Sequence, residues 1–480
     1  MKNPIQPTFD FNNPGNRLMT RLKKGDFITF FQVDTPAVSR DFKSAVAFLK
    51  SMDRAVRKVR GLYTGIALTD RMESVESWNV ADFAAEGLLQ SALDNNIVYV
   101  SGRNRSFAEI ADTVKRCSSS GLRNIIPVTG DGYSAPAPEQ ARHFGSIHTL
   151  KVIRGLHESD VIFQGCTVNP FKYSHLDAYP QYFKLVKKLN FGSKFIIAQA
   201  GWDMMKYQEL RWFLDSRELH YPTIARIFLL TPELVESILH GKYPGVHISR
   251  DFRMILEEEN RYGFKQFASA QWRRLQLQAA GCRLLGYSGI QITGIERPEH
   301  IATAADKIKK ALKEFKDFET WKQAYHEHIS RADMAPFEPR FYLFKNLFSA
   351  SHVNQPEINP EGVLHCSVFE KLHYLMCRSM FSQDHMLAPD EHRIAKKIMA
   401  GCSNCGYCRL PMTHYICPET CPKGLSNGPC GGSKVNGNCE LREKKCIHIK
   451  RAKLAAWLNE IDVLEERYIK HPDQGAKVKL

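Results

Sequence analysis

The feature that most constrains this fold is a regular alternation of short apolar runs and longer amphipathic stretches. Eight runs rich in β-branched and aromatic residues are predicted strands, at 27–31, 65–68, 97–100, 125–128, 163–167, 195–198, 224–229 and 289–293. Helical patterns lie between them, for example at 39–59, 81–95, 106–118 and 180–189. This alternation is typical of repeated βα units around a parallel sheet.

Eight βα units within about 300 residues favour a closed (β/α)8 TIM barrel of the α/β class. An open doubly wound sheet is the alternative. In a barrel of this type, functional side chains lie where the strands end and the following loops begin. Candidate residues are therefore sought at the carboxyl ends of the predicted strands.

A chain of 480 residues is longer than one hydrophobic core usually spans, so more than one domain is expected. We predict a tail at 1–20, the barrel at 21–320, a helical connector at 321–400 and a small cysteine-rich, metal-binding α-helical domain at 401–480. Prolines at 336, 339, 356 and 360 mark the boundary, 363–399 has a helical pattern, and 452–468 is a predicted terminal helix.

The formal net charge of +15 suits a nucleic acid, an anionic membrane or a small polyanion. No nucleic-acid motif is present, and no run approaches the roughly 18 apolar residues that span a bilayer. Lysines at 184–188 and 307–316 recur at helical spacing, which predicts solvated helix faces. We expect a cytoplasmic protein that binds neither nucleic acid nor membrane.

Cysteines are concentrated near the C-terminus, where eight of the thirteen fall within 45 residues. They are Cys402, Cys405, Cys408, Cys417, Cys421, Cys430, Cys439 and Cys446. The first three form C-x2-C-x2-C, a spacing that resembles part of a bacterial ferredoxin run. The N-terminus has no signal-peptide pattern, so metal ligation is favoured over disulfides. Zinc and an iron–sulfur cluster both stay open, and ordinary free thiols are the alternative.

Short motifs at several predicted strand ends form a recognisable series. The first strand lies in 25–36, GDFITFFQVDTP, and Thr69 ends the second. Further along come 99–105, YVSGRNR, then Thr129-Gly130-Asp131, and Gln199 after the sixth strand. In order and spacing, this series resembles the methylenetetrahydrofolate reductase family over about 20–310. The run NGPCGG at 427–432 resembles the C-terminal domain found with some members of that family.

The resemblance implies a flavin, FAD or alternatively FMN, at the top of the barrel. NAD(P)H or another donor would reduce it, and hydride transfer to methylenetetrahydrofolate would yield methyltetrahydrofolate. By the same match, Asp131 lies near the flavin and the pterin, Thr69, Tyr99 and Asn104 contact the flavin, and Gln199 binds folate. Each of these has a structural alternative, such as a helix cap or a side chain satisfied by the backbone.

One departure bears on the chemistry. Gln32 stands where the family has a glutamate that acts as general acid, and an amide cannot supply a titrating proton. Gln32 could keep a role in binding the substrate, and Asp34, on the same strand face, is a candidate substitute. Tyr99 and Thr129 replace the family's common His and Arg. These changes leave the direction open, and oxidation of methyltetrahydrofolate is one reading.

Two further function classes compete with a folate oxidoreductase. The first is a non-catalytic folate-binding partner of a methyltransferase, which suits the missing acid. The second is a corrinoid or folate methyltransferase, disfavoured because no Asp-x-His-x-x-Gly signature is present. Expected partners are a tetrahydrofolate derivative and an electron-transfer or methyltransferase protein. Family members are commonly oligomeric, so a homo-oligomer is an expectation too.

Overall fold

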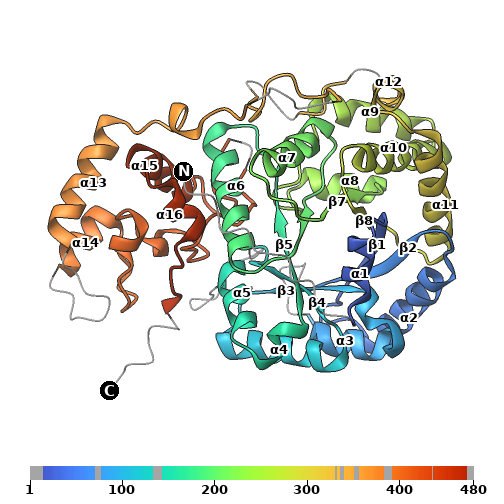
Figure 1. Ribbon diagram of the computed structural model, residues 1–480, viewed down its shortest axis with the longest axis horizontal. Helices are drawn as coiled ribbons and strands as arrows, with labels where there is room; N and C mark the ends of the chain where they lie inside the picture. Colours follow the sequence, from blue (N-terminus) through green and yellow to red (C-terminus); the bar gives the residue numbers. More distant parts are fainter. Residues whose placement is uncertain are drawn as a thin grey trace.

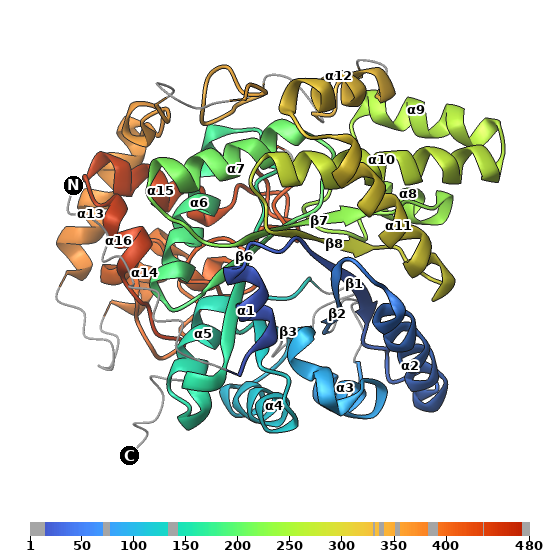
Figure 2. The same ribbon diagram turned by 45° about the vertical axis from the view of Figure 1, so that its right-hand side comes forward.

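Eight parallel strands close into a barrel in the computed structural model of the chain (Figures 1 and 2). The structure describes residues 15–70, 77–132, 143–329, 332–335, 340–350, 356–382, 392–434 and 436–472. The strands are β1 Ile28–Asp34, β2 Tyr63–Thr69, β3 Ile97–Ser101, β4 Asn124–Val128, β5 Phe163–Val168, β6 Phe195–Ala198, β7 Thr223–Phe228 and β8 Gly289–Thr293. All eight strand predictions are confirmed, and the pairing of β1 with β8 excludes the open sheet.

Helices cover the outside of the barrel and separate the strands in sequence. They are α2 Phe42–Lys58, α3 Val80–Gly87, α4 Phe107–Ser120, α5 Ser146–Arg154, α6 His175–Asn190, α7 Met204–Ser216, α8 Pro232–Leu239, α9 Arg250–Arg261, α10 Phe264–Leu284 and α11 Glu299–Glu314. The helix predicted at 81–95 is instead α3 followed by a 3₁₀ turn, Gln90–Asn95. Because helices bury the outer face of the sheet, most strand residues are buried on both faces.

The amino-terminal end of the barrel is filled by apolar side chains. Helix α1, Arg17–Lys23, places Leu18, Met19 and Leu22 against interior residues that include Ile28 and Phe30. Polar side chains gather at the opposite end, where the strands finish. This division leaves the carboxyl end of the barrel as the place for a ligand.

The C-terminal residues build a second, smaller core beside the barrel. After α12 Phe318–His328, the helices are α13 Val368–Phe381, α14 Arg393–Ala400, α15 Ile447–Trp457 and α16 Ile461–Glu466. Tyr374, Phe381 and Leu454 are buried together in this core. The single helix predicted at 452–468 is wrong: Asn459, with a φ of 55°, lies between α15 and α16. We call residues 392–434 and 436–472 the C-terminal module.

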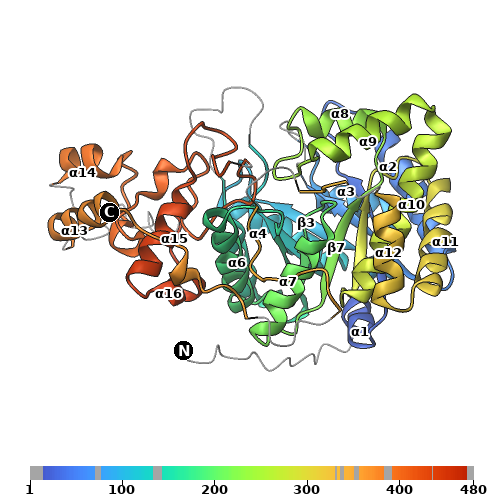
Figure 3. The same ribbon diagram turned by 90° about the horizontal axis from the view of Figure 1, so that it is seen from above.

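The module packs mainly against the barrel helix α6, through α15 and α16 (Figures 1 and 3). Lys184 and Lys187 of α6 are buried against the module, whereas Lys188 is buried against β5, where its Nζ donates to the Thr167 carbonyl oxygen. The exposed fractions of the three lysines are 5%, 1% and 7%. The prediction of a solvated face at 184–188 is therefore wrong. The prediction holds for α11, where Lys310 and Lys313 are exposed. Among the described residues, none of the helices combines the length and apolar character needed to cross a membrane.

Candidate active site

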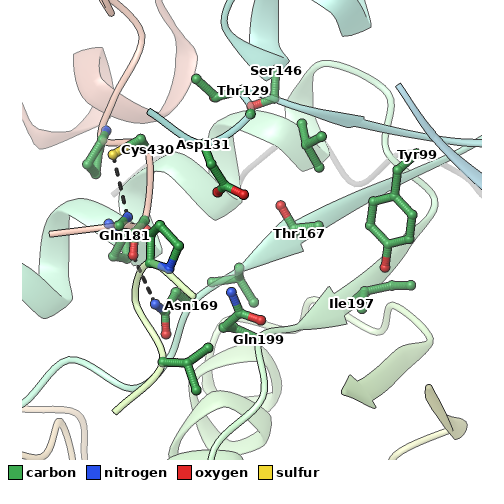
Figure 4. Close-up of a pocket in the computed structure, with 18 of the residues that line it drawn as sticks. Tyr99, Thr129, Asp131, Ser146, Thr167, Asn169, Gln181, Ile197, Gln199 and Cys430 are labelled. Carbon is green, nitrogen blue, oxygen red and sulfur yellow. Dashed lines mark hydrogen bonds between the residues drawn. The ribbon is translucent and has the colours of Figure 1, made fainter. Parts of the chain in front are cut away.

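A cavity of about 150 Å³ lies at the carboxyl end of the barrel, bounded by two parts of the chain. The strand ends supply Thr69, Tyr99, Asp131, Thr167 and Gln199, among others. In Figure 4, Asp131, Thr167 and Gln199 point into the same space, and Cys430 lies at its edge. Sites for drug-sized ligands start at about 300 Å³, so this cavity is small for two ring systems at once.

A hydrogen-bonded network crosses the barrel next to this cavity. Gln32 Oε1 accepts from Gln291 Nε2 at 3.0 Å and from Thr293 Oγ1 at 2.7 Å. Gln32 Nε2 donates to Asp34 Oδ1 at 2.7 Å, and Thr69 Oγ1 donates to the same oxygen at 2.6 Å. Both polar atoms of the Gln32 amide are thus engaged. The amide is 6% exposed and does not line the cavity.

The network extends to the strands on either side. Tyr99 donates its hydroxyl hydrogen to Gln291 Oε1 at 2.6 Å, and burial raises the pKa of Tyr99 to about 12. Arg226 Nε donates to Thr293 Oγ1 at 3.0 Å, and Arg226 Nη1 donates to Gln199 Oε1 at 3.2 Å. Residues from β1, β2, β3, β7 and β8, and Gln199 just after β6, are thereby held in one fixed arrangement.

Asp131 lies three residues beyond the end of β4, in the turn that Gly130 makes possible. Gly130 has a φ of 86°, and a Cβ there would lie 2.4 Å from Ser101 Oγ. His143 Nε2 donates to the carbonyl oxygen of Asp131 at 2.9 Å. Burial raises the pKa of the Asp131 carboxyl, and the positive charge of Lys423 opposes that shift.

The C-terminal module forms the remaining wall of the cavity. Lys423 Nζ donates to the Gly130 carbonyl oxygen at 2.9 Å and forms an ion pair with Glu440. Asn169, just after β5, donates through Nδ2 to the Gly431 carbonyl oxygen at 2.9 Å. The NGPCGG run therefore lies directly against the barrel, and Cys430 lines the cavity. Both parts of the chain therefore line the cavity.

The predicted site residues are not all brought together. Thr69, Tyr99, Asp131 and Gln199 line the cavity, and Gln32 is joined to it through hydrogen bonds. Asn104 is exposed, has a φ of 49° and does not line the cavity. Its predicted flavin contact has no support from this position.

None of the eight cysteines of the module takes part in a disulfide. Cys417 lies close enough to Cys402 and Cys405 to interact electrostatically with them. In the same way Cys421 interacts with Cys430, Cys439 and Cys446, and Cys430 interacts with Cys446. Burial raises the pKa of both Cys417 and Cys430 to about 11. Across the part of the chain that the structure describes, no three Cys, His, Asp or Glu side chains converge closely enough to hold a metal ion. The thiols as placed do not fit a metal site.

Sequence reasoning missed Arg226 and Gln291 as residues of this site. Both interrupt otherwise apolar strands, in Thr-Ile-Ala-Arg-Ile-Phe and Gly-Ile-Gln-Ile-Thr. A charged or amide side chain inside such a run is a usable signal, because it must find a polar partner when buried. Gln181, on α6, gave no such signal because polar residues are ordinary on a helix.

Comparison with family models decides the relationship. One model, described as methylenetetrahydrofolate reductase, matches residues 18–238, and another, described as methylene-tetrahydrofolate reductase C terminal, matches residues 382–474. The chain belongs to the methylenetetrahydrofolate reductase family. The first match takes in the candidate residues Gln32, Thr69, Tyr99, Asp131 and Gln199. The second takes in all eight clustered cysteines, so the family expectation is confirmed for both parts.

Comparison with solved structures shows similarity of fold. No curated protein sequence matches the chain. One solved structure is that of an uncharacterized protein from Clostridium thermocellum that binds two copies of 5-methyl-5,6,7,8-tetrahydrofolic acid. Its sequence is 14% identical to this chain, and the two structures superpose with a TM-score of 0.46. The superposition covers 62% of this chain and 99% of that protein. DHPS from Yersinia pestis, solved with a pterine-sulfa conjugate, is 10% identical, with a TM-score of 0.33, covering 60% of this chain and 95% of its own.

Proposed function

We propose that this member of the methylenetetrahydrofolate reductase family is a flavin-dependent oxidoreductase of folate C1 units. It would interconvert 5,10-methylenetetrahydrofolate and 5-methyltetrahydrofolate. Because hydride transfer brings the flavin and the pterin together, the cavity of about 150 Å³ would have to widen to hold both. The observation that carries the proposal is the convergence of Thr69, Tyr99, Asp131 and Gln199 on one cavity at the carboxyl end of the barrel.

The chemistry of the wall suits a flat heterocycle with carbonyl groups. Two buried donors, Arg226 Nη2 and Gln181 Nε2, have no partner among the described residues, and both residues line the cavity. Burying such donors is costly unless a ligand accepts from them. A flavin and a pterin both carry such acceptors. FAD or FMN would be held by Thr69, Tyr99 and Asp131, and when bound it would supply or accept the hydride.

The proton steps fall to the residues of the chain. Reduction adds hydride to the bridging methylene carbon, breaks the bond from that carbon to the departing nitrogen and puts a proton on that nitrogen. Gln32 cannot give this proton. Asp131 would stabilise the cationic iminium by its negative charge, and Asp34, which accepts a hydrogen bond from Gln32, is the candidate substitute for the acid. The amide at position 32 withholds the same proton transfer in reduction and in oxidation, so it does not select the direction of the reaction.

The first experiment is anaerobic purification, an absorbance spectrum and analysis for iron, sulfide and zinc, followed by titration with 5-methyltetrahydrofolate. Bleaching of a bound flavin would support the proposal. A protein that binds the folate without flavin would favour the second candidate, a non-catalytic folate-binding partner of a methyltransferase. That candidate is supported by the Gln32 amide, whose polar atoms are engaged within the protein.

A second experiment restores the missing acid. Gln32→Glu would place two carboxyl groups side by side, so one of them should take up a proton with a raised pKa. We expect reduction of methylenetetrahydrofolate to speed up by at least about 10-fold, since general acids contribute about 10²–10⁴. The gain should disappear as the pH rises through that pKa. Gln32→Leu is the matched control. A Gln32→Glu protein that binds folate and flavin without acceleration would contradict the proposed acid role.

The electron donor and the role of the cysteines stay predictions. NAD(P)H or an electron-transfer protein would reduce or reoxidise the flavin. Stopped-flow reduction of the flavin with NADH and with NADPH tests whether a nicotinamide nucleotide is the donor. Zinc or iron–sulfur ligation by the eight cysteines requires the thiols to move together and to release protons. Metal analysis of the purified protein, before and after a chelator, tests that prediction. Mass photometry tests whether the protein is a homo-oligomer.

A further inference from the structure

A second cavity lies where the C-terminal module meets the barrel. Its volume is about 20 Å³, and it is enclosed by α6, the start of the NGPCGG run, α15 and Leu464 of α16. These elements lie side by side in Figures 1 and 3. The residues around it include Lys184, Lys187, His448 and Arg451. It is separate from the folate site and shares only Lys184 and Pro429 with it.

Three basic side chains line this cavity, and the described residues around it include no carboxylate. Lys184, Lys187 and Arg451 are 5%, 1% and 3% exposed, and no Asp or Glu is among the described residues that line the cavity. Glu465 interacts with Lys187 but is already paired with Arg217, at 2.7 Å. A buried charge without an opposite charge costs several kcal/mol. Burial lowers the pKa of Lys184 to about 7 and that of Lys187 well below its usual value, whereas Arg451 stays charged at neutral pH with a pKa of about 10. An anion in the cavity would offset the Arg451 charge and hold the two lysines protonated.

Carbonyl oxygens satisfy only part of this need. Lys184 Nζ donates to the Pro429 carbonyl oxygen at 2.7 Å, and Lys187 Nζ donates to the Arg467 carbonyl oxygen at 2.8 Å. Arg451 Nη1 donates to the Ser426 carbonyl oxygen. Arg451 Nε, however, is buried and has no hydrogen-bond partner among the described residues. A donor of this kind, in a residue 97% buried, indicates a missing acceptor.

We propose that this cavity binds a single halide ion, chloride under ordinary conditions, which fastens the C-terminal module to α6. Size supports one small sphere, because about 10–15 Å³ is needed for a water molecule. A tetrahedral oxyanion such as phosphate is too large for 20 Å³. Pro180, Phe183 and Leu464 supply apolar contacts on the remaining sides, which a weakly hydrated halide tolerates. A neutral water molecule would fill the space and leave the charge of Arg451 uncompensated.

Bromide gives a direct test, since it replaces chloride and scatters anomalously. Crystals of the full chain grown or soaked in sodium bromide should show an anomalous peak between Lys187 and Arg451. A cavity with water and no anomalous peak would overturn the proposal. This measurement does not depend on folate or flavin binding, so its failure is distinct from failure of the proposed function.

Stability in solution gives a second test. At constant ionic strength, sodium bromide replaces sodium gluconate, and the melting temperature is followed for the wild type, Lys187→Met, Arg451→Met and Arg442→Met. A tenfold excess of bromide over its Kd shifts the folding equilibrium about 11-fold, and the wild-type Tm should rise on the order of 2 °C. Arg442 is exposed and outside the cavity, so its variant should respond like the wild type. Lys187→Met and Arg451→Met should lose the response. An equal response in all four proteins would contradict a site in this cavity.

Discussion

Helices α6 and α11 lie on the outside of the same barrel and both carry closely spaced lysines, yet their environments are opposite. Lys310 and Lys313 of α11 are in solvent, as expected of an amphipathic helix. Lys184, Lys187 and Lys188 of α6 are buried. Their ammonium groups donate to carbonyl oxygens of Pro429, Arg467 and Thr167 respectively. A lysine pattern therefore identifies a helix, but what docks on the helix decides whether the lysines are solvated.

The largest expected effect comes from a fully buried ion pair on α7, the helix after α6. Lys206 and Glu209 are both 0% exposed, with 3.0 Å between Nζ and Oε1, and Glu209 Oε2 accepts from the Leu343 amide. Glu209→Leu should cost about 3–5 kcal/mol, because it leaves an uncompensated buried charge. In the exposed pair Arg253–Glu257, Glu257→Leu should cost about 0–1 kcal/mol. Urea unfolding midpoints measure both. Equal losses of unfolding free energy in the two variants would show that burial of the Lys206–Glu209 pair does not change its contribution to stability.

The lysines themselves give the next effect. Lys184→Ala should destabilise the protein by about 2–3 kcal/mol, since two buried carbonyl groups lose their donor. Lys310→Ala, on the solvated helix, should stay within about 0.5 kcal/mol of the wild type. Thermal unfolding followed by circular dichroism compares the two. A large loss at Lys310 would mean that α11 is also covered in solution.

Acid should weaken the module interface more than the outer surface. His148 of α5 donates through Nε2 to the Ile469 carbonyl oxygen at 3.0 Å, and burial lowers its pKa to about 3. In the unfolded chain this pKa is about 6.5, so the unfolded state gains the proton first as the pH falls. The contribution of neutral His148 to the free energy of unfolding is complete above pH 6.5 and is lost as the pH falls from about 6.5 to about 3. At pH 5 the loss amounts to about 2 kcal/mol.

The matched histidine is His240, which is exposed. His148→Gln should flatten the fall in unfolding free energy between pH 6.5 and 5, whereas His240→Gln should leave it unchanged. Denaturant titrations at several pH values measure this slope. Identical slopes for the wild type and His148→Gln would contradict burial of His148 in the docked protein.

The smallest expected effect tests the close contact between the barrel and the C-terminal module at Gly245. Gly245 and Gly241 both have positive φ, 75° and 76°. A Cβ at Gly245 would lie 2.6 Å from the Gly431 carbonyl oxygen, whereas one at Gly241 would meet nothing within 4 Å. Both alanine variants share a backbone cost of roughly 1 kcal/mol. Gly245→Ala should lose about 1 kcal/mol more by overpacking. Limited proteolysis at the module boundary should show loosening only in Gly245→Ala.

The sequence by itself determined the barrel, since alternating runs of β-branched and amphipathic residues are local signals that fix where strands and helices form. It also placed Thr69, Tyr99, Asp131 and Gln199 at one end of the barrel, because parallel strands all finish on the same side. The substitution of Gln32 for an acid was visible without coordinates.

Only the tertiary structure decided how these residues are paired and covered. Gln32 finds its partners in Gln291 and Thr293, about 260 residues away, and α6 is buried by α15 and α16 from the far end of the chain. The cavity wall formed by Cys430 and Glu440 arises in the same way. Local periodicity reports which face of an element is apolar. It carries no information on which distant segment will approach a polar face and what hydrogen bonds that approach will make.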